Sequence, residues 1–277
     1  MESRTCPSLQ WFGHTDRGKV RANNEDAFLG LQFDAKEVHH LGKHGTASLQ
    51  NTDFVFAVSD GMGGARAGEY ASRIAVDKIT ALLPRAFQLS AEGLATGFED
   101  VLTELFNEIH GALTYLGSSY QECAGMQATL SLCWFTPRWM YFAHIGDTRI
   151  YYLPAGGTAI KRLSHDDTHV DWLFRNGQLN EREARTHPRR NVLQKALGGD
   201  NQFVDPQLGA VGYEPGDRFL LCSDGLVEGL YDQHLVELLN AAPASDPASR
   251  LVNEAVDRDG RDNTTALVIR LGPNQAS

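Results

Sequence analysis

The chain carries short apolar runs that are bounded by turn residues. Runs of this kind, rich in aromatic and β-branched side chains, predict β-strands. Four such runs between residues 127 and 163 are split by Thr136-Pro137, Gly146-Asp147 and Gly156-Gly157, which predicts an antiparallel meander. The other predicted strands cover residues 26–33, 53–59, 218–223 and 265–271.

Elsewhere the apolar positions recur every three or four residues, the spacing of one helix face. Pro84 follows the first of these segments and is expected to end that helix. Residues 34–52 are polar and predict a long loop, and residues 164–202 predict irregular chain with short helices. The predicted helices cover residues 67–83, about 92–116, 232–241 and 247–258.

Strand clusters alternate with helix pairs, and the gaps between them lack a regular βαβ rhythm. This order predicts an α+β fold class rather than a doubly wound α/β sheet. With no repeat, low-complexity tract or obvious linker in its 277 residues, the chain is expected to form a single domain over 1–277.

Charge and composition exclude several classes of partner. The 25 Lys and Arg against 35 Asp and Glu give a net charge of −10, which argues against nucleic acid or an anionic membrane surface. No apolar run approaches the roughly 18 residues of a membrane helix, and no signal peptide is apparent. The four cysteines lack CxxC spacing, and Cys133 and Cys222 are expected to be reduced core residues. The predicted location is cytoplasmic.

Two predicted strands end on the same tripeptide, Ser59-Asp60-Gly61 and Ser223-Asp224-Gly225. Each tripeptide by itself is typical of a turn. Acidic residues also stand at other strand ends, namely Glu25, Asp26, Asp147 and Asp262. Carboxylates gathered at one edge of a sheet would repel one another and lose hydration, so the pattern indicates bound cations. Oxygen donors without His or Cys at matching spacing favour Mg²⁺ or Mn²⁺ over zinc.

Five short motifs carry a resemblance to a known family. "RANNEDAF", "VSDGMGG", "HIGDTRIYYL", "CSDGL" and "GRDNTT" occur in this order. In order and spacing they resemble the PP2C-like (PPM) metal-dependent protein serine/threonine phosphatases, above all the bacterial branch. The resemblance extends from about Gly13 to Leu271. It implies an α-β-β-α sandwich, in which two antiparallel sheets are stacked between helix pairs.

The resemblance also implies a set of metal ligands. Asp60 would bridge two metal ions, and Asp224 and Asp262 would complete the ligands of the first ion. Glu25 and the backbone carbonyl of Gly61 would serve the second ion. The glycines of the two tripeptides would let the backbone come close to the ions.

Further roles follow from the same resemblance. Arg21 would hold the substrate phosphate, Asp26 would orient metal-bound water, and Asp147, with Asp224, would bind a weaker third ion. Met62 stands where many eukaryotic relatives have histidine, so the proton donor to the leaving group stays unassigned. Residues 164–195 correspond to the bacterial flap, a segment beside the active site that is expected to tune specificity.

The implied activity is hydrolysis of phosphoserine and phosphothreonine on proteins by a metal-activated water. The expected cofactors are two core Mn²⁺ or Mg²⁺ ions and a looser third one. The expected partners are phosphorylated proteins, including a bacterial Ser/Thr kinase and its targets, and the chain is expected to be a monomer.

Two alternatives remain. A regulatory or partner-binding protein of this fold would be expected to lack Asp60, Asp224 or Asp262, and all three are present. A phosphatase of a partner-switching sigma-factor pathway would generally carry an attached sensor domain, for which these residues leave no room.

Overall fold

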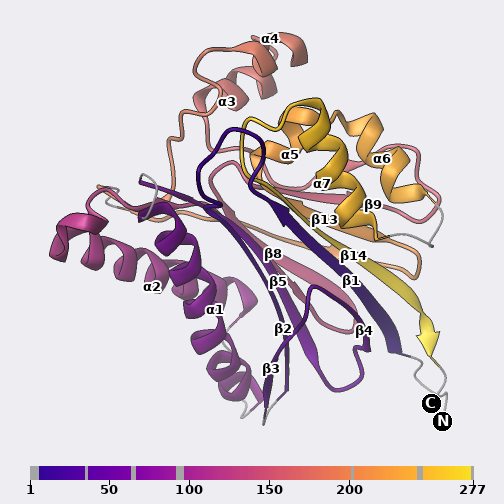
Figure 1. Cartoon of the computed structure of the whole chain (residues 1–277). Coiled ribbons are helices and arrows are strands. Elements are labelled where there is room, and N and C mark those ends of the chain that lie inside the picture. The colour runs from indigo at the N-terminus through magenta and orange to yellow at the C-terminus, as the bar shows by residue number, and fades with distance from the viewer. Residues whose placement is uncertain are drawn as a thin grey trace.

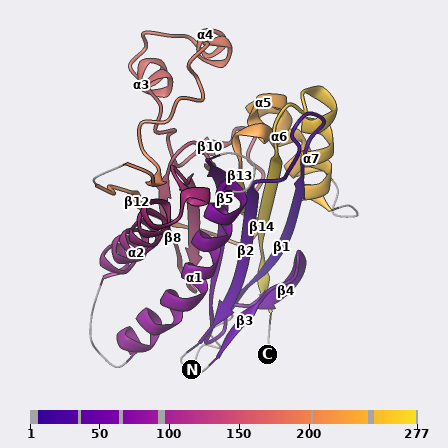
Figure 2. The same cartoon turned by 60° about the vertical axis from the view of Figure 1, so that its left-hand side comes forward.

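Two antiparallel β-sheets lie face to face, and helices cover the outer face of each sheet (Figure 1). The same layers are seen from another side in Figure 2. The predicted α+β class and the α-β-β-α sandwich are therefore confirmed. The computed structural model describes residues 6–34, 37–63, 67–91, 97–200, 203–241 and 246–275.

One sheet has six strands in the described part of the chain, and these include its first and last strands. Its longest pair joins the first and last strands, with Trp11 opposite Ile269 and Asp16 opposite Thr264. In spatial order the strands are β10 (Lys161–Arg162), β9 (Arg149–Leu153), β13 (Arg218–Cys222), β14 (Thr264–Gln275), β1 (Cys6–Asp16) and β4 (His44–Ser48).

The other sheet has eight strands among the described residues, and β5 (Asp53–Met62) is central to it. Phe54 and Phe56 of β5 point toward the other sheet, and Val55 and Ala57 point toward helices. Because both faces of β5 are buried, its apolar run is continuous rather than alternating. The remaining strands are β11 (Leu197–Gly198), β6 (Gln127–Ala128), β7 (Leu130–Phe135), β8 (Trp139–Ile145), β12 (Gln207–Gly212), β2 (Asp26–Phe33) and β3 (Val38–His40).

Helices form the two outer layers. On the eight-stranded sheet lie α1 (Ala67–Ala91) and α2 (Phe98–Ser119), and on the six-stranded sheet lie α5 (Asp224–Gly229), α6 (Asp232–Asn240) and α7 (Pro247–Arg258). Two further helices, α3 (His169–Arg175) and α4 (Glu181–Thr186), stand apart from the layers, beyond one end of the sandwich (Figure 2). A single 3₁₀ turn, η1 (Gln121–Cys123), follows α2.

The start of α7 illustrates how local sequence sets an element boundary. The Asp246 carboxylate accepts hydrogen bonds from the backbone N–H groups of Ala248 and Ser249, at 2.9 and 3.2 Å. Pro247 occupies the first turn, where a missing N–H costs the helix nothing. These caps satisfy donors that would otherwise lack partners, so the helix begins there.

Aromatic side chains fill the space between the two sheets. Phe135 of β7 meets Phe219 of β13 edge to face, with ring centroids 5.2 Å apart. Trp11 of β1 packs on Phe54 and Phe56 of β5, at 6.2 and 6.0 Å. Each of these contacts joins one sheet to the other, so this layer sets how the sheets are stacked.

Several predicted boundaries are wrong. Pro84 does not end α1, which continues to Ala91. A proline inside a helix costs about 3 kcal/mol, but buried contacts of earlier turns, such as those of Ala75 and Ile79, hold this helix to the sheet. The second helix begins at Phe98 rather than near 92, and 92–96 lie outside the described residues.

The predicted long loop at 34–52 contains the short strands β3 and β4. Strand β3 pairs with β2 of one sheet, and β4 pairs with β1 of the other. Their polar side chains are largely exposed, because both strands lie at sheet edges. The apolar pattern therefore did not reveal them.

The predicted meander is only partly correct. Strands β7 and β8 do pair as neighbours, but β8 and β9 belong to different sheets. The chain crosses between the sheets at Gly146-Asp147, where a hairpin was expected. A Gly-Asp turn looks the same in the sequence whether it closes a hairpin or leads to another sheet. Strand pairing decides between the two, and it depends on residues distant in sequence. Strands β1 and β12 were also not predicted.

Two smaller expectations are settled by the structure. Cys133 and Cys222 are buried and unpaired, as expected for reduced core residues. Within the described ranges, none of the helices combines the length and the apolar character needed to cross a membrane.

The first prediction concerns Asp53, which is 8% exposed and accepts a hydrogen bond from Trp134 Nε1 at 2.9 Å. Burial raises the pKa of Asp53 to about 6, although the Trp134 bond opposes this shift. The folded protein thus takes up this proton at a higher pH than the unfolded chain, so ionised Asp53 lowers stability above pH 6. Asp53→Asn keeps an acceptor for Trp134 and should stabilise the protein at pH 8 by up to about 3 kcal/mol.

Thermal melting of both proteins at pH 8 and pH 5 measures this effect. The advantage of Asp53→Asn should shrink at pH 5, where Asp53 is largely protonated in the folded state. An equal difference at both pH values would contradict the assignment.

Candidate functional site

The acidic strand ends meet at one end of the sandwich. Asp26 of β2 lies directly opposite Asp60 of β5 in the antiparallel register. Next to this pair, the Gly61 N–H donates to the carbonyl of Glu25 at 3.2 Å. The register thus brings Asp60 beside Glu25 and Asp26, which precede it by more than thirty positions in the sequence.

A pocket of about 390 Å³ opens at this end. It lies between the two sheets, because Asp60 lies near the end of a strand of one sheet and Asp224 and Asp262 flank strands of the other. Asp26 is the one predicted site residue that does not line it, and this residue is 9% exposed. The predicted site residues in the pocket are Arg21, Glu25, Asp60, Gly61, Asp147, Asp224 and Asp262.

Hydroxyl groups hold Asp26 in place. Ser223 Oγ and Thr265 Oγ1 each donate to Asp26 Oδ2 at 2.7 Å, while Oδ1 is buried and accepts no hydrogen bond. Asp224 Oδ1 is buried in the same way, without a donor. A buried carboxylate oxygen without a donor is unfavourable unless a cation or water faces it. These two oxygens therefore fit a site for divalent cations.

The two Ser-Asp-Gly corners use their serines differently. Ser223 Oγ donates to Asp26, whereas Ser59 Oγ donates to the carbonyl of Thr129 at 2.7 Å and so ties neighbouring strands together. A Cβ at Gly61 would lie 1.9 Å from the carbonyl oxygen of Gly68, and one at Gly225 would lie 2.1 Å from that of Asn263. The glycines therefore permit backbone to approach backbone at both corners.

Burial and mutual repulsion raise the pKa values of the carboxyl groups in this cluster. Burial, followed by nearby carboxylates, raises the pKa values of Asp60 and Asp224 well above the ordinary range. Burial also raises the pKa of Asp147 to about 7 and that of Asp26 to about 6. Several negative charges that are close together and poorly hydrated favour the binding of cations.

The spacing of these groups bears on the kind of cation. Among the described side chains, no group of three acidic, histidine or cysteine residues is already arranged around an ion position. The side chains that line the pocket offer oxygen donors, and none of the described residues lining it is a histidine or cysteine. Oxygen donors suit Mg²⁺ or Mn²⁺ better than zinc, which prefers nitrogen and sulfur ligands.

Arg21 brings a positive charge to the same pocket. Its Nη2 donates to Asp262 Oδ2 at 2.6 Å, and the side chain is 52% exposed. The loop that carries it is tied down by Asn263, whose Nδ2 donates to the carbonyls of Arg17 and Asn23 at 2.9 Å. An exposed guanidinium on an anchored loop can reach an anion at the pocket mouth.

Asp147 lies in the turn where the chain passes from one sheet to the other, and it is 8% exposed. Hydrogen bonds hold both the N–H and the carbonyl of the neighbouring Gly146. Its N–H donates to Asp167 Oδ2 at 2.9 Å, and its carbonyl accepts from the Asp167 N–H at 2.7 Å and lies 3.1 Å from His144 Nε2. These bonds fix the turn so that Asp147 faces the pocket.

Comparison with known proteins identifies the family. The family model for protein phosphatase 2C matches residues 42–258. The chain belongs to the protein phosphatase 2C family. The resemblance seen in its motifs is thereby confirmed.

Individual members of the family resemble the chain over most of its length. It is 31% identical to the serine/threonine protein phosphatase PstP of Mycobacterium tuberculosis over 96% of its length, and it spans 46% of that relative. It is 31% identical to the serine/threonine phosphatase Stp of Listeria monocytogenes over 92% of its length, and it spans 93% of that relative. The chain thus spans about half of the mycobacterial relative and nearly all of the listerial one.

A solved structure supports the fold assignment. The crystal structure of the catalytic domain of PstP, in complex with two manganese ions, superposes with a TM-score of 0.74 at 28% identity and covers 96% of this chain and 99% of that one. A divalent metal is therefore present in a protein of the same family and fold.

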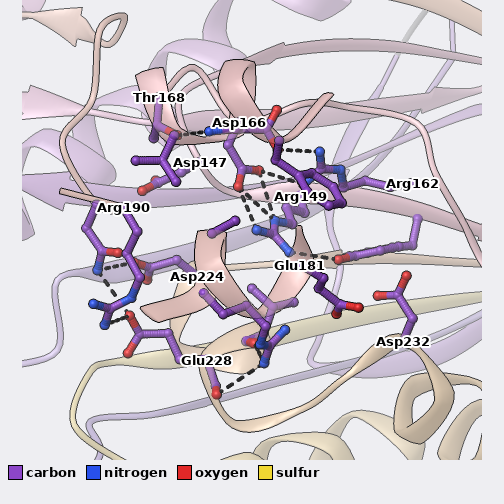
Figure 3. A pocket seen from close by; sticks show the side chains of 18 of the residues that line it. Asp147, Arg149, Arg162, Asp166, Thr168, Glu181, Arg190, Asp224, Glu228 and Asp232 are labelled. Carbon is purple, nitrogen blue, oxygen red and sulfur yellow. Dashed lines mark hydrogen bonds and ion pairs between the residues drawn. The ribbon is translucent and has the colours of Figure 1, made fainter. Parts of the chain in front are cut away.

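In this phosphatase 2C chain, residues 164–195 (the flap segment) border a second pocket, of about 350 Å³ (the flap pocket, Figure 3). Arg149 ties the base of the flap segment to β9, because its Nε and Nη2 donate to Asp166 at 2.6 to 3.2 Å. Further along, Arg185 Nη2 donates to the carbonyl of Val227 in α5 at 2.6 Å. The flap segment therefore contacts the core near both of its ends.

Sequence reasoning missed one residue that lines both pockets, Asn191. Its Nδ2 lies 3.4 Å from Asp224 Oδ2. A single asparagine in a polar segment gives no signal of its own, so only the tertiary structure could reveal this contact.

The second prediction follows from the raised pKa values of the carboxyl cluster. Without divalent ions, ionised Asp60, Asp147 and Asp224 lower the stability of the folded protein at pH 8. Their folded pKa values lie above the unfolded value, so lowering the pH from 8 to 5 should raise the melting temperature in EDTA. With Mn²⁺ present the trend should reverse, because protons then compete with bound ions.

Melting curves across this pH range, with EDTA and with Mn²⁺, provide the measurement. The same pH trend under both conditions would show that the cluster does not bind Mn²⁺.

Proposed function

We propose that this chain hydrolyses phosphoserine and phosphothreonine on proteins with the help of divalent cations, as one phosphatase domain spanning residues 1–277. The observation that carries the proposal is that seven of the eight predicted site residues line one pocket. Membership of the protein phosphatase 2C family and the named phosphatase relatives support it.

Two core Mn²⁺ or Mg²⁺ ions are proposed. Asp60 would be shared by both ions, Asp224 and Asp262 would hold the first, and Glu25 with the Gly61 carbonyl would hold the second. The two manganese ions of the PstP structure support this number of core ions. Asp147 and Asp224 are proposed to bind a third, weaker ion. The donor-free Oδ1 of Asp224 and the raised pKa values of the cluster fit these roles.

When bound, the cations supply a nucleophilic water at neutral pH and neutralise charge on the phosphoryl group. The chain contributes orientation. Asp26, held by Ser223 and Thr265, is proposed to orient the attacking water from beside Asp60. Arg21 is proposed to leave Asp262 and pair with the phosphate, for which its planar fork of donors is suited. Its charge also offsets the net charge of −10 near the pocket.

The proposed partners are phosphorylated proteins, including a bacterial Ser/Thr kinase and its targets. The flap segment is proposed to contact the substrate. The flap pocket shares Asp147, Asn191 and Asp224 with the 390 Å³ pocket that the proposed metal ligands line (the metal pocket). A monomeric chain in the cytoplasm remains the expectation from the sequence. A purely regulatory role is disfavoured, since every predicted ligand is present.

The third prediction tests the activity itself. Purified protein should release phosphate from a phosphothreonine peptide and from p-nitrophenyl phosphate when Mn²⁺ or Mg²⁺ is added, and EDTA should abolish this release. Loss of a group that only supports metal ligands typically costs up to about 100-fold. Asp60 is a proposed ligand itself, so Asp60→Asn should lower kcat by more than that. Asp205→Asn, on the exposed side chain that pairs with Lys195, is the matched control and should keep full activity.

Full activity after complete removal of metal would refute the mechanism. Absence of activity with every metal would favour the regulatory alternative.

The fourth prediction separates two roles for Asp147. If it binds a third ion whose waters protonate the leaving group, Asp147→Ala should lower kcat on phosphopeptides, whose alkoxide leaving groups need a proton. The loss should be smaller on p-nitrophenyl phosphate, which has a good leaving group. Kinetics on both substrates, a Mn²⁺ titration and a melting curve make the comparison. Equal losses together with a large drop in melting temperature would assign Asp147 to the turn alone.

A further inference from the structure

Glu228 lies outside the metal pocket, but residues of the flap segment and Arg261 contact its carboxylate. It stands one helical turn after Asp224 on α5, and its side chain is 13% exposed. Arg190 Nη2 of the flap segment donates to Glu228 Oε1 at 2.7 Å (Figure 3). A carboxylate in this position lines the flap pocket and not the metal pocket.

One contact leads from Glu228 to Asp224. Asn191 Nδ2 lies 3.1 Å from Glu228 Oε1 and 3.4 Å from Asp224 Oδ2, so one amide group bridges the two carboxylates. With Oδ2 facing this donor, Oδ1 of Asp224 is left buried and without a hydrogen-bond donor. The amide therefore distinguishes the two oxygens of Asp224.

A second contact leads from Glu228 to Asp262. Arg261 Nη2 lies 3.8 Å from Glu228 Oε2, and Arg261 directly precedes Asp262 in the chain. Arg261 also pairs with Asp259 at 2.8 Å, so its guanidinium lies between two carboxylates. Glu228 is thus in contact with one residue beside Asp224 and one residue beside Asp262.

We propose that Glu228 is a positioning residue of the metal centre, which holds Asn191 against Asp224 and pairs with Arg261, the residue that precedes Asp262. This inference rests on the proposed function, in which both aspartates are metal ligands. Groups outside a ligand set that orient the ligands typically change metal affinity by 10- to 100-fold when removed. Through Arg190 and Asn191, the same carboxylate joins the flap segment to the metal centre.

Its own contacts distinguish Glu228 from a metal ligand and from a simple surface ion pair. Oε1 already accepts from two donors and Oε2 faces Arg261, and the carboxylate does not line the metal pocket. A surface ion pair contributes little to stability and has no effect on a distant metal site. Metal affinity is therefore the quantity that separates the two roles.

The test is a calorimetric Mn²⁺ titration of the full chain after metal removal, with a melting curve of each metal-free variant. Glu228→Ala should weaken Mn²⁺ binding by about 10-fold. Glu228→Gln keeps a carbonyl acceptor for Arg190 and Asn191 and should recover most of the affinity. Glu254→Ala, which removes a comparable 2.8 Å ion pair with Arg258 on α7, is the control and should bind Mn²⁺ normally.

Asn191→Ala provides a second variant on an exposed side chain, in case Glu228→Ala fails to fold. It should also weaken Mn²⁺ binding, without lowering the melting temperature. Unchanged Mn²⁺ affinity in the folded variants would overturn the inference, as would equal losses in Glu228→Ala and Glu228→Gln, which would indicate charge rather than position. If the unaltered protein bound no Mn²⁺, the proposed function itself would fail, and this inference with it.

Discussion

Repulsion among buried carboxylates is the constraint on which this structure depends. Asp26 and Asp147 are buried, Asp60 and Asp224 are half-buried beside them, and desolvation raises the pKa of each. Such a cluster would relax apart in a flexible chain. Here strand register, hydroxyl donors and backbone contacts hold the groups together, so the energy of their repulsion becomes available for binding cations.

The sandwich supplies the rigidity that this cluster requires. Asp26 and Asp60 belong to one sheet, whereas Asp224 and Asp262 adjoin strands of the other. Their separation therefore depends on the aromatic layer between the sheets, including the edge-to-face contact of Phe135 with Phe219. A core change in this layer would alter the distance between the two halves of the site as well as stability.

The flap segment adds a second level of organisation around the same carboxylates. Arg185 binds a backbone carbonyl of α5, and Arg190 and Asn191 bind Glu228 on the same helix. Helix α5 also carries Asp224 in its first turn. The flap segment and Asp224 are thus connected through one short helix.

The sequence by itself determined the α+β class, the family motifs and the acidic residues that line the pocket, because these depend on local periodicity and short turns. It did not reveal that β8 and β9 lie in different sheets, that α1 passes through Pro84, or that 34–52 contains two edge strands. Strand pairing and helix continuation are decided by contacts between residues distant in sequence. Asn191 was missed for the same reason, because only the fold brings it beside Asp224. Glu228 lies one helical turn after Asp224, but its contacts with Arg190 and Asn191 also form only in the folded chain.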